Sequence, residues 1–144
     1  MNMPAQPRRG FSLIELVVVL AIIAVLATLA LPGFRDQVLR SRRAEAREAL
    51  QMLQLAQERF RSQAPRYAQR LEELGHAATS RNGLYQLRIV QADRTRYAME
   101  AHATGAQTGD RTCRVLMLSL ENGSVRATGF DDHGAERVDA CWPQ

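Results

Sequence analysis

Residues 11–31 have the sequence FSLIELVVVLAIIAVLATLAL. Between Leu16 and Leu31 it carries no charged side chain and only one polar side chain, that of Thr28. As a helix, a segment of this length would be about 31 Å long, which matches the hydrocarbon thickness of a bilayer. We therefore predict that residues 11–31 form one membrane-spanning helix.

The rest of the chain has the composition of a soluble domain. The protein has 144 residues, of which 46% are hydrophobic and 24% are charged, and both values are close to the averages for globular domains. This composition excludes wholly disordered, collagen-like and disulfide-dense chains. The length suits one domain and is too short for two domains with separate cores. We expect a membrane segment joined to one compact soluble part.

The net charge of +4 is unevenly distributed along the chain. Residues 1–70 carry 11 arginines and 5 acidic residues, whereas residues 71–144 carry 8 arginines and 10 acidic residues. The basic excess therefore belongs to the N-terminal half. A charge of this size over this length gives little support for nucleic-acid binding as the main function.

The N-terminus differs from an ordinary secretory signal, in which a small-residue cleavage site follows the apolar stretch. Here no such site directly follows Leu31, and the basic pair Arg8-Arg9 and then Gly10 come immediately before the apolar stretch. Basic residues favour the cytoplasmic side of a membrane. We predict that the N-terminus lies inside the cell, although arginines beyond the apolar stretch dilute this bias.

Glu15 is the one acidic residue within the apolar stretch. A carboxylate at mid-bilayer costs about 3 kcal/mol on insertion scales, and less near the interface, where Glu15 would lie. In one interpretation Glu15 stays hydrated at the interface. In the other, a cut after Gly10 creates a new amino group on Phe11, and parallel packing lets one subunit's Glu15 neutralise a neighbour's Phe11 amine.

Residues 8–16, RRGFSLIEL, resemble the prepilin cleavage and methylation motif of type IV pilins and of the related pseudopilins of type II secretion. The resemblance implies that a prepilin peptidase cuts between Gly10 and Phe11 and that the Phe11 amine is methylated. It also implies that Glu15 is the assembly acid, and that Pro32 is the proline that kinks the helix of such pilins. The implied family is that of the type IV pilins, in particular the small minor pilins.

Beyond Pro32 the sequence becomes charged, yet apolar residues recur at intervals of three and four and form one helical face. These residues are Leu39, Ala46, Ala49, Leu50, Leu53, Ala56 and Phe60. Pro65 predicts that this amphipathic helix ends near Ser62. We therefore expect the helix of residues 11–31 to continue, bent or opened at the proline, as an amphipathic helix over residues 32–62.

The second half of the chain shows the period-two alternation of strands. The expected strands are residues 85–89, 97–102, 112–120 and 125–128. Asn122-Gly123 predicts a tight hairpin between the last two strands. We expect an α+β fold, in which an antiparallel sheet of about four strands packs on the amphipathic half of the long N-terminal helix, as in the type IV pilin fold.

These elements predict four regions. Residues 1–10 would be a leader peptide, residues 11–31 the hydrophobic assembly helix and residues 32–62 the amphipathic helix. Residues 63–144 would form a globular head. The head would contain a connecting loop with a short helix near 69–74, the sheet, and a disulfide-bounded C-terminal region.

Cys113 and Cys141 lie in the soluble part, and an even number of cysteines in an exported chain predicts a disulfide. Such a bond would stabilise the fold by about 3 to 4 kcal/mol. The resemblance to pilins points to the same pair as the boundary of the C-terminal region. A zinc or catalytic role is not expected, because His76, His102 and His133 show no ligand spacing with the cysteines or with one another.

The sequence contains no sign of an enzyme, since it lacks a Gly-rich phosphate loop, Gly-x-Ser-x-Gly and His-Glu-x-x-His. Asp131-Asp132, Glu136 and Asp139 form an acidic cluster whose spacing is not that of a calcium loop, so we interpret it as a solvated surface. We expect no enzymatic activity, no cofactor and no bound metal.

Two alternatives stay open. Arg88, Arg94 and Arg96, which would lie around one end of a hairpin, are a candidate DNA contact, and some minor pilins bind incoming DNA. An ordinary solvent-facing sheet surface is the simpler interpretation. A pseudopilin of a type II secretion system would share the N-terminal motif, but the paired cysteines and the Cys141-Trp142 ending favour a pilin.

The function expected from this resemblance is that of a structural subunit, a minor pilin, of a type IV pilus. It would be needed for pilus assembly and for the associated twitching motility, adhesion or DNA uptake. Before assembly it would be a single-pass inner-membrane protein in contact with lipid, and afterwards a part of the extracellular filament. The expected partners are other pilin subunits, prepilin peptidase and the inner-membrane assembly machinery, with DNA a less expected one.

Overall fold

A computed structural model of the protein describes residues 12–143, apart from the side chains of residues 29–32. The chain divides into two compact units, Met1–Asp36 and Gln37–Gln144. The first unit contains the hydrophobic part of the long helix. The second contains the amphipathic part of that helix and the globular head.

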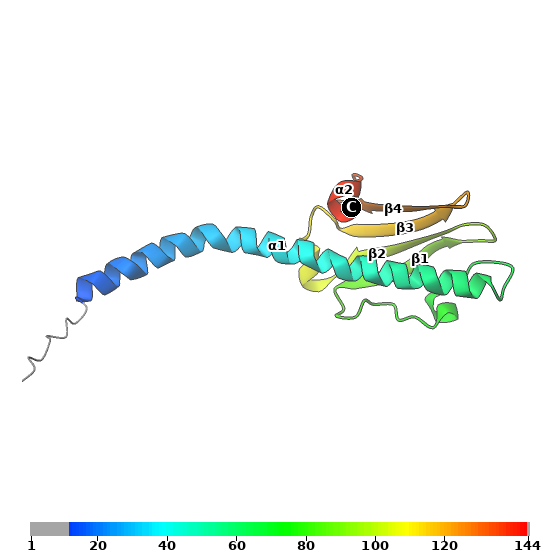
Figure 1. Cartoon of the computed structure of the whole chain (residues 1–144), viewed down its shortest axis with the longest axis horizontal. Coiled ribbons are helices and arrows are strands. Elements are labelled where there is room, and N and C mark those ends of the chain that lie inside the picture. Colours follow the sequence, from blue (N-terminus) through cyan, green and yellow to red (C-terminus); the bar gives the residue numbers. More distant parts are fainter. Residues whose placement is uncertain (1–11, 144) are drawn as a thin grey trace, which may run out of the picture. The chain divides into compact units, whose positions relative to one another are not determined.

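Helix α1 spans Leu13–Arg61 and is the blue-to-green helix in Figure 1. It ends next to Ser62, which confirms the helix stop predicted from Pro65. Within the described residues, no single helix is both long and apolar enough to cross a membrane. The stretches Leu13–Thr28 and Gly33–Arg61 meet the length and composition requirements only together, as a bent pair.

Four strands form one antiparallel sheet in the order β1-β2-β3-β4 (Figure 1). The strands are β1 (Tyr85–Ala92), β2 (Tyr97–Ala103), β3 (Val115–Glu121) and β4 (Ser124–Phe130). This sheet and α1 confirm the predicted α+β fold. The hairpin between β3 and β4 turns at Asn122 and Gly123, whose φ values of 52° and 75° are those that a type I′ turn requires.

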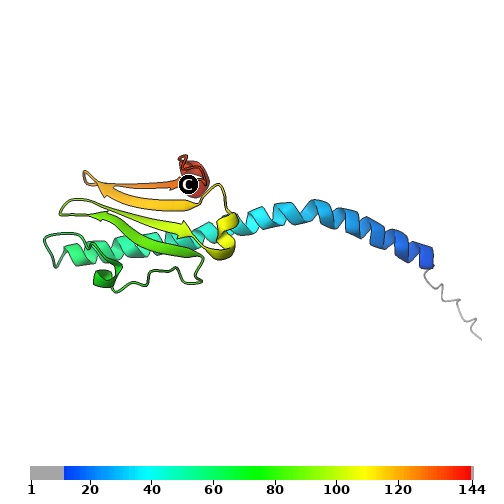
Figure 2. The ribbon, with the colours of Figure 1, turned by 180° about the vertical axis from the view of Figure 1, so that it is seen from behind.

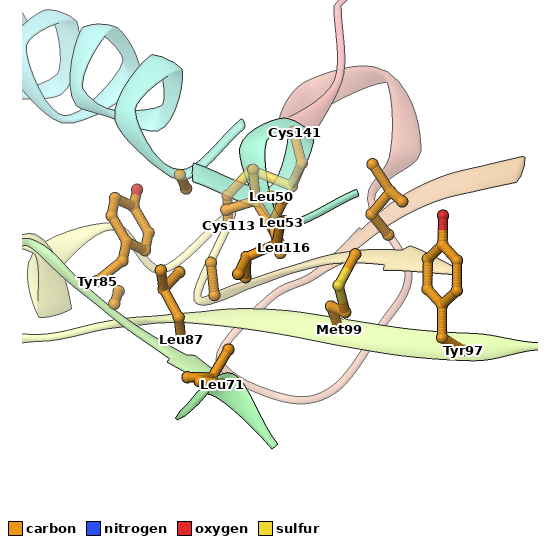
Figure 3. Packing of buried hydrophobic residues seen from close by; sticks show 14 of the residues in the cluster. Leu50, Leu53, Leu71, Tyr85, Leu87, Tyr97, Met99, Cys113, Leu116 and Cys141 are labelled. Atoms are coloured by element: carbon orange, nitrogen blue, oxygen red, sulfur yellow. A yellow bond between two sulfur atoms is a disulfide. The ribbon is translucent and has the colours of Figure 1, made fainter. Parts of the chain in front are cut away.

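The hydrophobic core lies between one face of the sheet and the amphipathic part of α1, and Figure 2 shows these two layers in the head. Alternate residues of the strands and one face of the helix meet there (Figure 3). The largest fully buried members are Leu50, Leu53, Tyr85, Tyr97, Met99 and Leu116. The middle of the predicted apolar stripe is therefore covered by the sheet: Ala46, Leu50 and Leu53 are buried and Ala49 packs against them. Leu39, Ala56 and Phe60 at its ends are only half-buried. This shared core explains why both elements are stable together.

Besides α1, the described residues form two 3₁₀ helices and one further short α-helix. The 3₁₀ helix η1 (Leu71–Leu74) lies between α1 and β1, within the stretch for which the sequence predicted a short helix. A second 3₁₀ helix, η2 (Gly105–Gly109), joins β2 to β3, and α2 (Val138–Cys141) follows β4. The C-terminal region therefore contains a helical turn rather than a further strand.

A disulfide joins Cys113 to Cys141, with the two Cα atoms 5.6 Å apart. Both cysteines are fully buried, and the bond fastens α2 to the loop that precedes β3. Gly129 of β4 makes this packing fit, because a Cβ atom there would lie 2.5 Å from the Cβ atom of Cys141. Any larger residue at this position would push the disulfide off the sheet.

A buried ion pair ties α1 to the same region of the head. The guanidinium of Arg43 donates from Nε and Nη2 to the two carboxylate oxygens of Asp110, at 2.6 and 2.8 Å. Its Nη1 donates to the carbonyl oxygen of Ala140 at 2.7 Å. Asp110 also accepts the backbone N–H of Cys113. One arginine of the helix thus contacts both segments that the disulfide joins.

Candidate functional site

A cleft of about 640 Å³ lies at the end of the head where α1 ends. Its walls come from the last turn of α1, from Tyr67, and from the turns that join β1 to β2 and β3 to β4. Both turns lie at this end because the strands run up and down in sequence order. We call these residues the turn cleft. They are Arg61, Tyr67, Asp93, Arg94, Thr95, Arg96, Glu121, Asn122 and Gly123.

The β1–β2 turn is fixed by the side chain of Asp93. Its carboxylate accepts the backbone N–H groups of Thr95 and Arg96, at 2.8 and 3.0 Å. It also accepts Nε of Arg96 at 2.8 Å. The N–H of Thr95 and the guanidinium of Arg96 lower the pKa of Asp93 to about 2, so this carboxylate is ionised at physiological pH. These hydrogen bonds hold the turn together. Of the two arginines in the turn, Arg94 and Arg96, only Arg96 has its charge compensated by Asp93.

The lining of the turn cleft contains three arginines and two acidic residues, Asp93 and Glu121. Because Asp93 pairs with Arg96, the other two arginines stand against the single carboxylate of Glu121, and the cleft keeps a positive charge. The Arg94 side chain is exposed, and it forms no hydrogen bond or ion pair within the described residues. Arg61 donates to the carbonyl oxygen of Ala64 at 3.1 Å, and its guanidinium lies 5.9 Å from the centre of the Tyr67 ring. Such a cation over an aromatic ring is held in place without losing its charge. The turn cleft can therefore accept an anion.

Of the three arginines predicted to cluster, Arg94 and Arg96 lie together in the turn cleft, whereas Arg88 is not part of it. Arg88 sits opposite Glu100 in the sheet register. Its Nε and Nη2 both donate to one carboxylate oxygen of Glu100, at 2.9 and 2.6 Å. Arg61 was not among the predicted site residues, and its only signal in the sequence was its place at the predicted end of the helix.

The acidic cluster that follows β4 holds its own loop together. Asp131 accepts the backbone N–H groups of His133 and Ala135, both at 2.9 Å. Asp132 accepts Nε of Arg111 at 2.7 Å. These contacts lower the pKa of both carboxyl groups. Within residues 12–143, no group of three or more His, Cys, Asp or Glu side chains is placed to hold a metal ion.

The hydrophobic part of α1 is the second candidate functional surface. Its large apolar side chains from Leu13 to Leu26 are 44–81% exposed, so the rest of the first unit leaves them uncovered. Glu15 lies in the first turn of α1 and is exposed. Gly10 and Phe11 lie outside the described residues, as does the side chain of Pro32. The predicted cleavage, methylation and kink therefore stay predictions.

Comparisons with known proteins match two consecutive segments of the chain to family models. The family model described as "Type IV minor pilin ComP, DNA uptake sequence receptor" matches residues 32–117. The model of the prokaryotic N-terminal methylation motif matches residues 6–31. The chain is also similar to the type IV major pilin protein PilA of Myxococcus xanthus (strain DK1622), with 42% identity over 84 residues. That match covers 58% of this chain and 38% of the relative's length.

Proposed function

The chain belongs to the type IV minor pilins of the ComP family, and on this basis we propose that it is a structural subunit of a type IV pilus. The uncovered apolar surface of α1 between Leu13 and Leu26 is the observation that carries the proposal. Exposed apolar area of this extent requires lipid or other helices to cover it. Lipid would cover it in a membrane-anchored precursor, and the same helix of neighbouring subunits would cover it in the filament.

The maturation steps follow from the N-terminal motif. In our proposal, a prepilin peptidase cuts the precursor after Gly10, and the new Phe11 amine is methylated. The cut removes the basic leader, and the mature chain then begins at the apolar surface that packs in the filament. Partners would be other pilins and the assembly machinery of the inner membrane. The match to pilins, including a major pilin, favours a pilus over a type II secretion system.

Replacing Gly10 with serine is expected to leave a precursor that keeps its leader, because the larger side chain disturbs the bond that the peptidase cuts. The N-terminal peptide of the chain is measured by mass spectrometry in the membrane fraction, where the uncut variant should accumulate, and in sheared surface filaments. The unmodified protein should yield a methylated peptide that begins at Phe11. Gly33→Ser is the matched control, since a Cβ atom at Gly33 meets nothing within 4 Å. Filament-borne chains that begin at Met1 would contradict the proposal.

A second candidate function is DNA binding by the turn cleft. Two observations favour it: the excess positive charge of Arg61 and Arg94 over Glu121 in the turn cleft, and the family description, which names a DNA uptake sequence receptor. Guanidinium groups bind phosphates through paired N–H donors. In this proposal the turn cleft holds the sugar-phosphate backbone, and the uptake of DNA is a role of the pilus that carries the subunit.

The DNA proposal predicts a defined dependence on salt. For the full chain in detergent, the logarithm of the DNA affinity should fall linearly with the logarithm of the salt concentration. The double variant Arg61→Gln/Arg94→Gln should reduce the slope by about 2, because each phosphate contact contributes about 0.9. Arg59→Gln is the control, because Arg59 lies in the same last turn of α1 but outside the turn cleft. An unchanged slope in the double variant would exclude this site.

A further inference from the structure

A second cleft, of about 380 Å³, lies where α1 meets the C-terminal tail of the head. Three arginines of α1 line it, and they stand three and four residues apart, on one face of the helix. We call this group the basic cleft. Its lining residues are Arg40, Arg43, Arg47, Thr112, Asp139, Ala140 and Pro143. All of them belong to the second unit of the chain.

Two of the three arginines keep donors available in the basic cleft. The charge of Arg43 is matched by its buried ion pair with Asp110. Arg47 is half-buried, and it donates one hydrogen bond, from Nη1 to the carbonyl oxygen of Cys141 at 3.0 Å. The exposed side chain of Arg40 donates none within the described residues. Both guanidinium groups therefore have N–H donors left for a ligand.

The charge balance of the basic cleft favours an anion. Asp139 is the one acidic residue among the described lining residues. Because the charge of Arg43 is paired with Asp110, the charges of Arg40 and Arg47 exceed that of Asp139. The surrounding segment of α1, residues 35–47, contains five arginines and two acidic residues. A phosphate group, which arginine recognises with paired donors, is the chemistry that such a cleft fits best.

The position along the chain indicates where that phosphate comes from. Arg40 follows Leu31, the last residue of the apolar stretch, by only nine residues, so in the anchoring proposed above it belongs to the first part of the chain to leave the hydrocarbon. The headgroup layer of a bilayer extends about 5 to 8 Å beyond the hydrocarbon. Long arginine side chains that follow a membrane segment reach back for this headgroup layer.

We propose that the basic cleft binds the phosphate headgroup of an anionic glycerophospholipid while the precursor waits in the membrane. This inference rests on the membrane anchoring proposed above. The bound headgroup would hold the head against the membrane surface through Arg40 and Arg47. Release of the lipid would accompany movement of the subunit into the filament.

The test uses the full chain reconstituted in nanodiscs that contain phosphatidylglycerol and phosphatidylcholine, with retained lipids counted by native mass spectrometry. Arg40→Gln should lower the preference for phosphatidylglycerol about fivefold, and Arg40→Gln/Arg47→Gln should lower it about fivefold again. Asp139→Asn should raise the preference, because it removes the opposing negative charge. Arg40→Gln alone removes no hydrogen bond of the described fold, so misfolding does not complicate its result.

The control is the double variant Arg59→Gln/Arg70→Gln, which changes the net charge equally at two exposed arginines outside the basic cleft and the turn cleft. It should keep the full preference for phosphatidylglycerol. An equal loss in this control, or no loss in Arg40→Gln, would overturn the proposal. Displacement of the lipid by inorganic phosphate as effectively as by phosphatidylglycerol would identify a site for free phosphate and would also overturn it.

Two further outcomes separate this inference from the proposed function. If Arg40→Gln/Arg47→Gln keeps its lipid preference but fails to enter filaments, the cleft binds a carboxylate of a neighbouring subunit, and the lipid proposal is wrong. Flotation with phosphatidylcholine vesicles tests anchoring by itself. A chain that floats without any preference for phosphatidylglycerol contradicts only the lipid site, whereas a chain that does not float contradicts the anchoring.

Discussion

Replacing Asp110 with alanine is expected to lower the free energy of unfolding of the head by about 3 to 5 kcal/mol, the range for removal of one partner of a buried ion pair. Arg43 and Asp110 are 6% and 3% exposed. The substitution would leave the Arg43 cation buried without its counter-charge, and it would also leave the backbone N–H of Cys113 without its acceptor. The loop that carries the disulfide would therefore loosen together with its contact to α1.

Urea unfolding of the full chain in detergent measures this loss, and the single tryptophan, Trp142, supplies the fluorescence signal. Asp132→Ala is the matched control, because Asp132 pairs with Arg111 at 2.7 Å but the Arg111 side chain is 76% exposed. An exposed pair of this kind contributes about 0 to 1 kcal/mol. If Asp110→Ala and Asp132→Ala lowered the free energy of unfolding equally, the buried ion pair would stabilise the head no more than an exposed one, and the prediction would be wrong.

A second variant separates two contributions to the free energy of unfolding: the destabilisation by an unpaired buried charge, and the stabilisation by the ion pair itself. Replacing both partners with apolar residues, Arg43→Met/Asp110→Leu, removes the buried charge together with its partner. This double variant should be clearly more stable than Asp110→Ala, because exchanging a whole buried ion pair for apolar residues is often close to neutral. A double variant as unstable as the single one would show that the hydrogen bonds to Ala140 and Cys113 carry the stability.

The regular elements of the fold were predictable because each depends on local periodicity. The end of α1 at Arg61 follows from Pro65, and the turn at Asn122-Gly123 follows from the positive φ that its residues tolerate. The third strand was expected from residue 112 but begins at Val115. Its first residues are held differently, because the N–H of Cys113 is taken by the carboxylate of Asp110. A hydrogen bond between a side chain and the backbone does not change the alternation of apolar and polar residues, so the sequence pattern could not predict this later start of the strand.

The sites were less predictable because they depend on register and on distant contacts. Arg88, Arg94 and Arg96 are neighbours in sequence, but the register of β1 and β2 puts Glu100 opposite Arg88 and compensates its charge. In the sequence, Arg43 is one of many arginines in the basic N-terminal half. Its buried pairing could not be predicted, because its partner Asp110 is 67 residues away. Alternation predicts which face a residue occupies, but only the pairing of elements decides which opposite charge it meets.

The other large effect is expected at Glu15. Glu15→Ala should insert into the membrane at least as well as the unmodified chain, because a carboxylate is costly there. Its incorporation into filaments should fall more than tenfold. In the proposed assembly, the carboxylate pairs with the Phe11 amine of a neighbour, and two such charges about 4 Å apart attract each other by about 4 kcal/mol at an effective dielectric constant of 20. Packing of apolar helices alone would leave their axial register undefined.

The measurement compares the amount of chain in sheared filaments with the amount in the inner membrane. Ser12→Ala is the control, since Ser12 is a neighbouring exposed position without charge. Glu15→Gln then decides between the two interpretations of the acid. A carboxylate that merely stays hydrated at the interface can be replaced by a neutral amide of the same shape, so incorporation would be normal. A carboxylate that neutralises an amine cannot be replaced in this way, so Glu15→Gln should fail as Glu15→Ala does, although both variants are cut after Gly10.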